Sequence, residues 1–95
     1  MQLTEATGST LLTMPGTRER GRMARLAILR ELDRRERAGV RPPTYDELAT
    51  MLDVSRPAAR KHVLRLVALE MVTLQADKYR SAALTDKGRG LAREF

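Results

Sequence analysis

The proline pair Pro42-Pro43 restricts the fold of this 95-residue chain more than any other feature. Proline has no backbone N–H and disfavours helix in the residue before it, so the chain must be extended here. Immediately afterwards, Thr44 and Glu47 have the spacing of a capping box, in which each side chain bonds the other's backbone. The sequence therefore predicts a break between two helices, and the second of them covers residues 45–52.

A longer helix is predicted before the prolines, over residues 18–38. Thr17 can cap its start, and Gly39 can end it in a left-handed turn. Its apolar residues recur at three- and four-residue spacing and form one stripe, whereas the other faces are dense in charge. The stripe consists of Ala24, Ile28, Leu29 and Leu32.

A third helix is predicted over residues 56–70, after the tight link Asp53-Val54. Ser55 is a good N-cap, and proline is tolerated in the first turn because the N–H groups there have no intrahelical partner. One face of this helix is apolar and the other is basic, which is the pattern of a helix held on a scaffold and exposed to a polyanion. The apolar face has Ala59, Val63 and Leu66, and the other has Pro57, Lys61, Arg65 and, to one side, Arg60.

The remaining residues predict a small β-hairpin and a last helix. Val72-Thr73-Leu74 suits a short strand, residues 76–79 can turn, and residues 80–84 can return. Thr85 can cap a helix over residues 86–95, with Leu91 and Phe95 on its inner side. Gly88 and Gly90 weaken that helix. The predicted fold class is mainly α with a small β-hairpin: a three-helix core, a short wing and a short C-terminal helix.

Charge divides the chain into two parts. Residues 1–17 hold one acid, Glu5, and no lysine or arginine, and we interpret them as a flexible N-terminal arm in which Leu11, Leu12 and Met14 can dock on the body or on a second copy. Residues 18–95, predicted to be one domain, hold all 18 basic residues and 11 acids. This excess attracts a polyanion, of which nucleic acid is the commonest.

Several classes of function are disfavoured. The chain has no cysteine and one histidine, His62, expected on the core side of its helix, so we expect no metal site and no cofactor. No catalytic constellation or phosphate-cradling glycine loop is present, so we expect no enzyme. No apolar run approaches the roughly 18 residues of a membrane span and no secretory signal is evident, so we expect a cytoplasmic, nucleoid-associated protein. The small core also suggests no room for a sizeable ligand pocket.

Two segments resemble known DNA-binding families. The run from Gly39 to Ala49 resembles the start of the helix-turn-helix in LexA-type repressors, and the run from Ser55 to Val63 is similar to their recognition helix. Leu84-Thr85-Asp86-Lys87-Gly88 resembles the strand-to-helix junction after the wing in MarR-like regulators. The resemblance covers roughly residues 22–90 and implies a winged helix-turn-helix domain that binds double-stranded DNA.

Carried onto this sequence, the resemblance implies that one face of the third helix contacts the bases and backbone of DNA. Arginine and lysine can reach guanine or phosphate oxygens, and a small residue lets the helix approach the bases. LexA-type helices have asparagine at the position of Pro57, acids at those of Arg60 and Lys61, and glycine at that of Glu70, so a different base sequence would be read. The expected contacts are Ser55, Arg56, Pro57, Ala58, Arg60, Lys61 and Arg65 on the recognition helix, with Thr44 and Tyr45 at the preceding helix and Lys78 and Arg80 in the wing.

The function expected from these features is a DNA-binding transcriptional regulator, a repressor of bacterial or phage type that binds as a homodimer. An alternative is a winged-helix protein–protein module, an accessory factor that binds polymerase or another regulator. An apolar flank on the third helix, at Leu64, Val67 and Ala68, favours that alternative. RNA binding is a third option, although the chain has only two tyrosines and one phenylalanine for base stacking.

Overall fold

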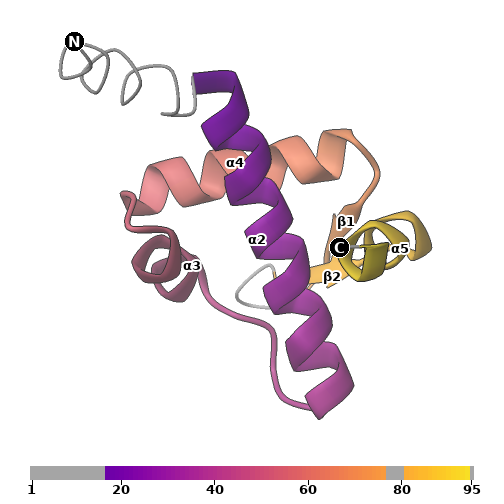
Figure 1. Cartoon of the computed structure of the whole chain (residues 1–95). Helices are drawn as coiled ribbons and strands as arrows, with labels where there is room; N and C mark the ends of the chain where they lie inside the picture. The colour runs from indigo at the N-terminus through magenta and orange to yellow at the C-terminus, as the bar shows by residue number, and fades with distance from the viewer. Residues whose placement is uncertain (1–16, 77–80, 95) are drawn as a thin grey trace, which may run out of the picture.

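The computed structural model describes residues 17–76 and 81–94. It is mainly helical, with one two-stranded antiparallel sheet, which confirms the predicted class at that level. In Figure 1, α4 runs across α2, while α3 and the sheet lie at opposite ends of α4. The elements are α2 (Thr17–Ala38), α3 (Tyr45–Leu52), α4 (Arg56–Ala68), β1 (Val72–Leu74), β2 (Ala82–Leu84) and α5 (Asp86–Glu94).

Some predictions lie outside the described residues. They are the arm over residues 1–16, the turn residues 77–79, the wing residues Lys78 and Arg80, and the inward position of Phe95. Among the described helices, none combines the length and the apolar character needed to cross a membrane.

Local capping explains the ends of α2 and α3. Gly39 has φ +70°, and the N–H of Val40 donates to the Arg35 carbonyl at 3.1 Å, which closes α2 as predicted. At α3, the Thr44 hydroxyl oxygen accepts from the Glu47 N–H at 3.1 Å, and Glu47 accepts from the Thr44 N–H at 2.9 Å. The capping box is therefore present. α2 begins at Thr17, one residue before the predicted start.

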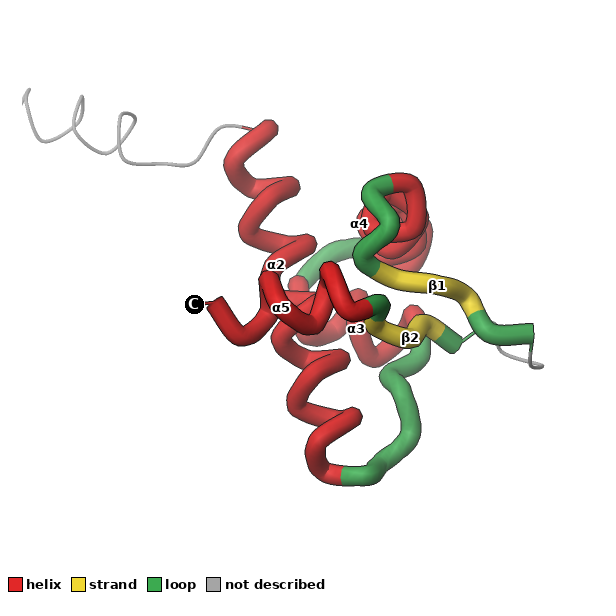
Figure 2. The backbone as a smooth tube through the Cα atoms, turned by 90° about the vertical axis from the view of Figure 1, so that its right-hand side faces the viewer, coloured by secondary structure: helices red, strands yellow, loops and turns green. Residues whose placement is uncertain are grey.

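The core forms around α2, and every described helix and strand contributes to it. Ile28, Leu29 and Leu32 are each at most 4% exposed, whereas Ala24 of the predicted stripe is only half-buried. Figure 2 shows α5 crossing α2 on one side and the sheet beside α4. The residues that cover the α2 stripe are Leu48, Ala49, Ala59, Val63, Leu66, Val72, Ala82, Leu84 and Ala92.

Two ion-pair clusters fasten α5 to α2. Asp33 is buried, with a 3% exposed side chain, and its carboxylate oxygens lie 3.1 Å from Arg37 Nε and 3.1 Å from Arg93 Nε. Nearby, Glu36 accepts two hydrogen bonds from Arg89, at 2.7 and 2.9 Å. A buried carboxylate left without a partner would be strongly destabilising, so Arg93 ties the position of α5 to that of α2.

The C-terminal end of α4 differs from the prediction, because the helix ends at Ala68 instead of residue 70. Glu70 has φ +62°, its N–H donates to the Val67 carbonyl at 2.9 Å, and the Met71 N–H donates to the Leu66 carbonyl at 3.0 Å. This is the left-handed helix ending that glycine usually makes. Glu70 therefore holds a backbone conformation that favours glycine.

The segment from Leu84 to Gly88 docks onto this helix ending. The Thr85 hydroxyl donates to the Glu70 carbonyl at 2.7 Å, and Lys87 Nζ donates to the Leu69 carbonyl at 2.9 Å. A Cβ atom on Gly88 would lie 2.0 Å from the Met71 carbonyl oxygen. Glycine at this position is therefore required for close packing, a role that helix propensity alone did not reveal.

The sheet is small, and along β1 Val72 is buried, Thr73 is exposed and Leu74 is half-buried. Val72 pairs with Leu84, and Leu74 pairs with Ala82. The second strand is shorter than predicted, although the Gln75 N–H still donates to the Ser81 carbonyl at 2.8 Å beyond it. Val72 and Leu84 are buried against the helices, which holds the hairpin on the body.

Gly88→Ala tests the close approach of α5 to Met71. We expect it to lower the free energy of unfolding by at least about 2 kcal/mol, because overpacking against rigid backbone exceeds the gain of about 1 kcal/mol in helix propensity. Gly90→Ala is the matched control, since nothing lies within 4 Å of its Cβ position. We expect the control to gain about 0.5–1 kcal/mol. Urea unfolding measures both variants, and equal effects would contradict the packing role.

Glu70→Gly tests the strain at the end of α4. An L-residue in the left-handed region is disfavoured by about 1–2 kcal/mol, partly offset by the greater freedom of glycine in the unfolded chain. We therefore expect a net gain of about 0.5–1 kcal/mol in urea unfolding. Asp53→Gly is the comparison, because Asp53 also has positive φ (57°) but aspartate tolerates it better. A loss of stability in Glu70→Gly would show that the Glu70 side chain contributes more than its backbone strain costs.

Candidate functional site

The candidate site is the solvent face of α4. A tight turn connects α4 to α3 and holds the two helices together. Asp53 adopts the left-handed conformation, and the Val54 N–H donates to the Ala49 carbonyl at 3.0 Å, so the chain reverses within residues 53–55. The Ser55 hydroxyl oxygen then accepts from the Ala58 N–H at 3.2 Å. Ser55 is thus the N-cap predicted from the sequence.

The two faces of α4 separate as the periodicity predicts. Ala59, Val63 and Leu66 are at most 1% exposed and face the core. Ala58 is half-buried, so a flat, small-residue surface lies beside the first turn. The exposed residues are Ser55, Arg56, Pro57, Arg60, Lys61 and Arg65.

Ion pairing distinguishes three basic residues of α4 from most arginines of the scaffold. Arg35 lies 2.7 Å from Glu31, Arg41 lies 2.8 Å from Glu47, and similar pairs neutralise arginines of α2 and α5. On α4, Arg56 lies 3.6 Å from Asp46. Within the described residues, Arg60, Lys61 and Arg65 have no carboxylate in ion-pair range, and their side chains form no hydrogen bond. Their charge is therefore open to an external anion.

Two carboxylates of the scaffold, those of Glu47 and Glu31, stay ionised because they are paired with arginines. The Arg41 guanidinium, followed by the backbone N–H of Thr44, lowers the pKa of Glu47 to about 2. Hydrogen bonds from Arg34 and then Arg35 lower the pKa of Glu31 to about 2. These acids are thus satisfied by their own arginines and do not offset the charge of α4.

His62 contributes no charge to the site at neutral pH. Its side chain is half-buried between α2 and the C-terminal end of α3, as a residue on the core side of α4. Burial and then the nearby Arg25 lower its pKa below the usual value of 6.5. The basic face therefore depends on arginine and lysine alone.

The structure gives two of the other expected contact residues structural roles. The Thr44 hydroxyl caps α3, and Tyr45 is half-buried against the core. Both lie at the start of the helix that precedes α4, and Thr44 remains exposed.

The three apolar residues on the flank of α4 differ in burial, and part of the flank packs within the protein. Val67 packs against the core, Leu64 is half-buried and Ala68 is exposed, so the three do not form an exposed stripe. Large exposed apolar side chains occur instead at Met23 (55%) and Met51 (43%). Met23 was not predictable from the periodicity, because it lies next to the predicted stripe of α2 and outside its spacing.

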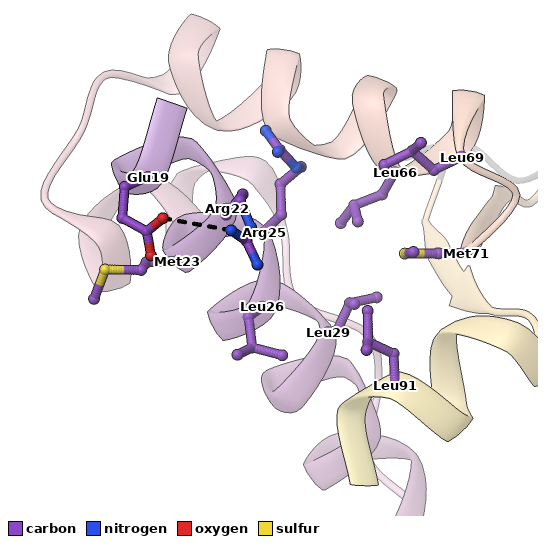
Figure 3. A pocket seen from close by; sticks show the side chains of 10 residues that line it. All are labelled: Glu19, Arg22, Met23, Arg25, Leu26, Leu29, Leu66, Leu69, Met71 and Leu91. Carbon is purple, nitrogen blue, oxygen red and sulfur yellow. Dashed lines mark hydrogen bonds and ion pairs between the residues drawn. The ribbon is translucent and has the colours of Figure 1, made fainter. Parts of the chain in front are cut away.

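The second surface feature is a groove. An open groove of about 450 Å³ lies between the first half of α2, the C-terminal half of α4, and α5. Figure 3 shows its side chains, among them Leu26, Leu69 and Leu91, around a common space. The groove is open to solvent on one side, so it is a surface feature and the expectation of no sizeable ligand pocket stays a prediction.

No protein-family model matches the sequence, and the search of curated proteins finds no match either. Functional interpretation therefore depends on the chemistry of the α4 face and of its surroundings.

Substitutions of Ser55 test the cap at the start of the site. Ser55→Ala removes the acceptor for the Ala58 N–H, so we expect a loss of about 1 kcal/mol in urea unfolding. Ser55→Asp is the control, because aspartate caps equally well and its charge suits a helix N-terminus. An alanine variant as stable as the unmodified protein would contradict the capping role.

Proposed function

We propose that this protein is a DNA-binding transcriptional regulator with a winged helix-turn-helix arrangement. In this interpretation, α3, the turn over residues 53–55 and α4 form the helix-turn-helix, and β1 and β2 form the base of the wing. One observation carries the proposal. Three basic side chains, Arg60, Lys61 and Arg65, lie on the solvent face of α4 with no ion-pair partner among the described residues, and the other face of α4 is buried in the core.

The proposed mode of binding places α4 in the major groove, which is wide enough to admit a helix. Pro57 and Ala58 carry no long side chain, so the first turn can approach base edges closely. Arg60 and Lys61 would then reach guanine or phosphate oxygens, and the N–H groups at the helix start would meet a phosphate. Arg56, which has only a long contact to Asp46, is a further phosphate ligand in this scheme.

The remaining expected contacts extend this proposal. Thr44 and Tyr45 would meet the DNA backbone beside the groove, and Lys78 and Arg80 of the wing would add backbone or minor-groove contacts. The mechanism is occupancy of an operator by two copies, since one module of this size buries limited surface. We propose the setting of a bacterial or phage repressor in the cytoplasm, associated with the nucleoid.

A second candidate is a protein–protein module. The observation that favours it is the exposed apolar surface formed by Met23, Met51 and Val54, which line one groove between α2 and α3. Exposed apolar side chains that gather on one surface often mark a protein interface.

The DNA proposal is tested by binding of the full chain to duplexes selected from a random library, measured by fluorescence anisotropy across a salt series. We expect steep salt dependence, because each phosphate contact adds about 0.9 to the slope. The double variant Arg60→Ala/Lys61→Ala should lower that slope by about 2, and each single change should cost about 1–3 kcal/mol where a base contact is lost.

Arg34→Ala/Arg37→Ala is the matched control, because it removes the same charge from α2, where Glu31 and Asp33 already pair both arginines. We expect the control to retain most of the affinity. Undiminished binding by the Arg60/Lys61 variant would refute the assigned face. Capture of a protein partner, with no DNA bound, would favour the second candidate.

A further inference from the structure

The groove between α2, α4 and α5 has an apolar interior that is incompletely covered. Its floor includes Leu29 and Leu66, which are 1% exposed and belong to the core. Above them, four large apolar side chains from three parts of the chain are only half-buried, and they surround the same space in Figure 3. They are Leu26, Leu69, Met71 and Leu91.

Such a surface favours an apolar occupant, because covering it removes hydrocarbon from water. The rim adds a charge preference. Arg22 lies 3.5 Å from Glu19, and Arg25, half-buried, has no carboxylate in ion-pair range within the described residues. The groove therefore suits an apolar segment that is free of positive charge.

We propose that the occupant is the N-terminal segment of the same chain, residues 1–16, with Leu11, Leu12 and Met14 covering the half-buried leucines. The segment joins α2 at Thr17, beside the groove residue Glu19. Pro15-Gly16 interrupts helix at the junction and permits the chain to reverse.

The lengths agree with this arrangement. Along α2 the groove runs from Glu19 to Leu29, which is about 15 Å at 1.5 Å per helical residue. Leu11 to Met14 precede Thr17 by three to six residues, and an extended chain covers about 3.3 Å per residue, so they reach roughly 10–20 Å along the helix. The apolar residues therefore fall over the interior of the groove.

The charges agree as well. Residues 11–16, which the proposal places over the groove, contain no lysine or arginine, so they bring no positive charge beside Arg22 and Arg25. The same absence of bases makes the segment a poor phosphate ligand. The segment is thus assigned to the groove of its own chain and not to DNA, and this inference does not depend on DNA binding.

A second groove, between α2 and α3, is the competing place for the segment. It is about 530 Å³ and includes Met23, Met51 and Val54. Its apolar side chains are mostly exposed, and none belongs to the most deeply buried part of the core. The groove at Leu69 and Leu91 is preferred because it continues the core directly.

Cysteine cross-linking of the full chain locates the segment, because the sequence has no native cysteine. We expect Leu12→Cys/Leu69→Cys to be joined within one chain by a short thiol-specific cross-linker. The matched control, Leu12→Cys/Met51→Cys, should react much less. Equal or preferred reaction at position 51 would overturn the proposal, as would cross-linked dimers from the first pair, which would assign the groove to a second copy.

Stability of the full chain gives an independent readout. Leu11→Ser/Leu12→Ser exposes the groove, so we expect Tm to fall by about 5–10 °C, the range for a small domain that loses part of its apolar burial. Thr10→Ser/Thr13→Ser changes the same segment without removing apolar side chains and should leave Tm within about 1 °C. An unchanged Tm in the leucine variant would overturn the proposal. Neither readout contains DNA, so failure of the proposed function does not affect it.

Discussion

The organisation of this protein depends on how the start of α5 docks on the segment that follows α4. The N–H groups of residues 69–71 satisfy the last carbonyls of α4, and the carbonyls of that segment accept donors from the start of α5. Thr85 donates its hydroxyl to the Glu70 carbonyl and its N–H to the Met71 carbonyl, at 2.7 and 3.1 Å. Gly88 permits this contact, since any Cβ there would collide with Met71. The junction joins the sheet and α5 to α4, and so helps to orient the face that we propose for DNA.

Electrostatics then separates a neutralised scaffold from a charged face. Most acids of α2 and α3 are paired with arginines of α2, α5 and the connecting loop, and Arg41 and Arg34 hold the pKa values of Glu47 and Glu31 at about 2. Asp46 lies 3.6 Å from Arg56 of α4, whereas Arg60, Lys61 and Arg65 have no carboxylate in ion-pair range within the described residues. Ion pairing also joins α5 to the scaffold, because Arg93 of α5 pairs with the buried Asp33 of α2.

Features that depend on neighbouring residues were predictable from the sequence. The capping box at Thr44, the left-handed end of α2 at Gly39 and the N-cap at Ser55 each involve residues within a few positions of one another. The buried and exposed faces of α4 follow from the 3.6-residue period, so the exposed set containing Arg60 and Lys61 was also predictable. Whether that set binds DNA is the proposal, because exposure and charge alone do not identify a ligand.

The sequence by itself determined where α3 and α4 begin, which side of α4 is buried and the mainly helical class, because capping and periodicity act over one or two helical turns. Only the tertiary structure decided that Glu70 takes a left-handed conformation, that Gly88 must lack a side chain and that Val67 is covered. It also decided which carboxylates neutralise which arginines, since Asp33 meets Arg93 across 60 positions of the chain. These features arise where distant segments pack together, and no local pattern encodes the identity of the partner.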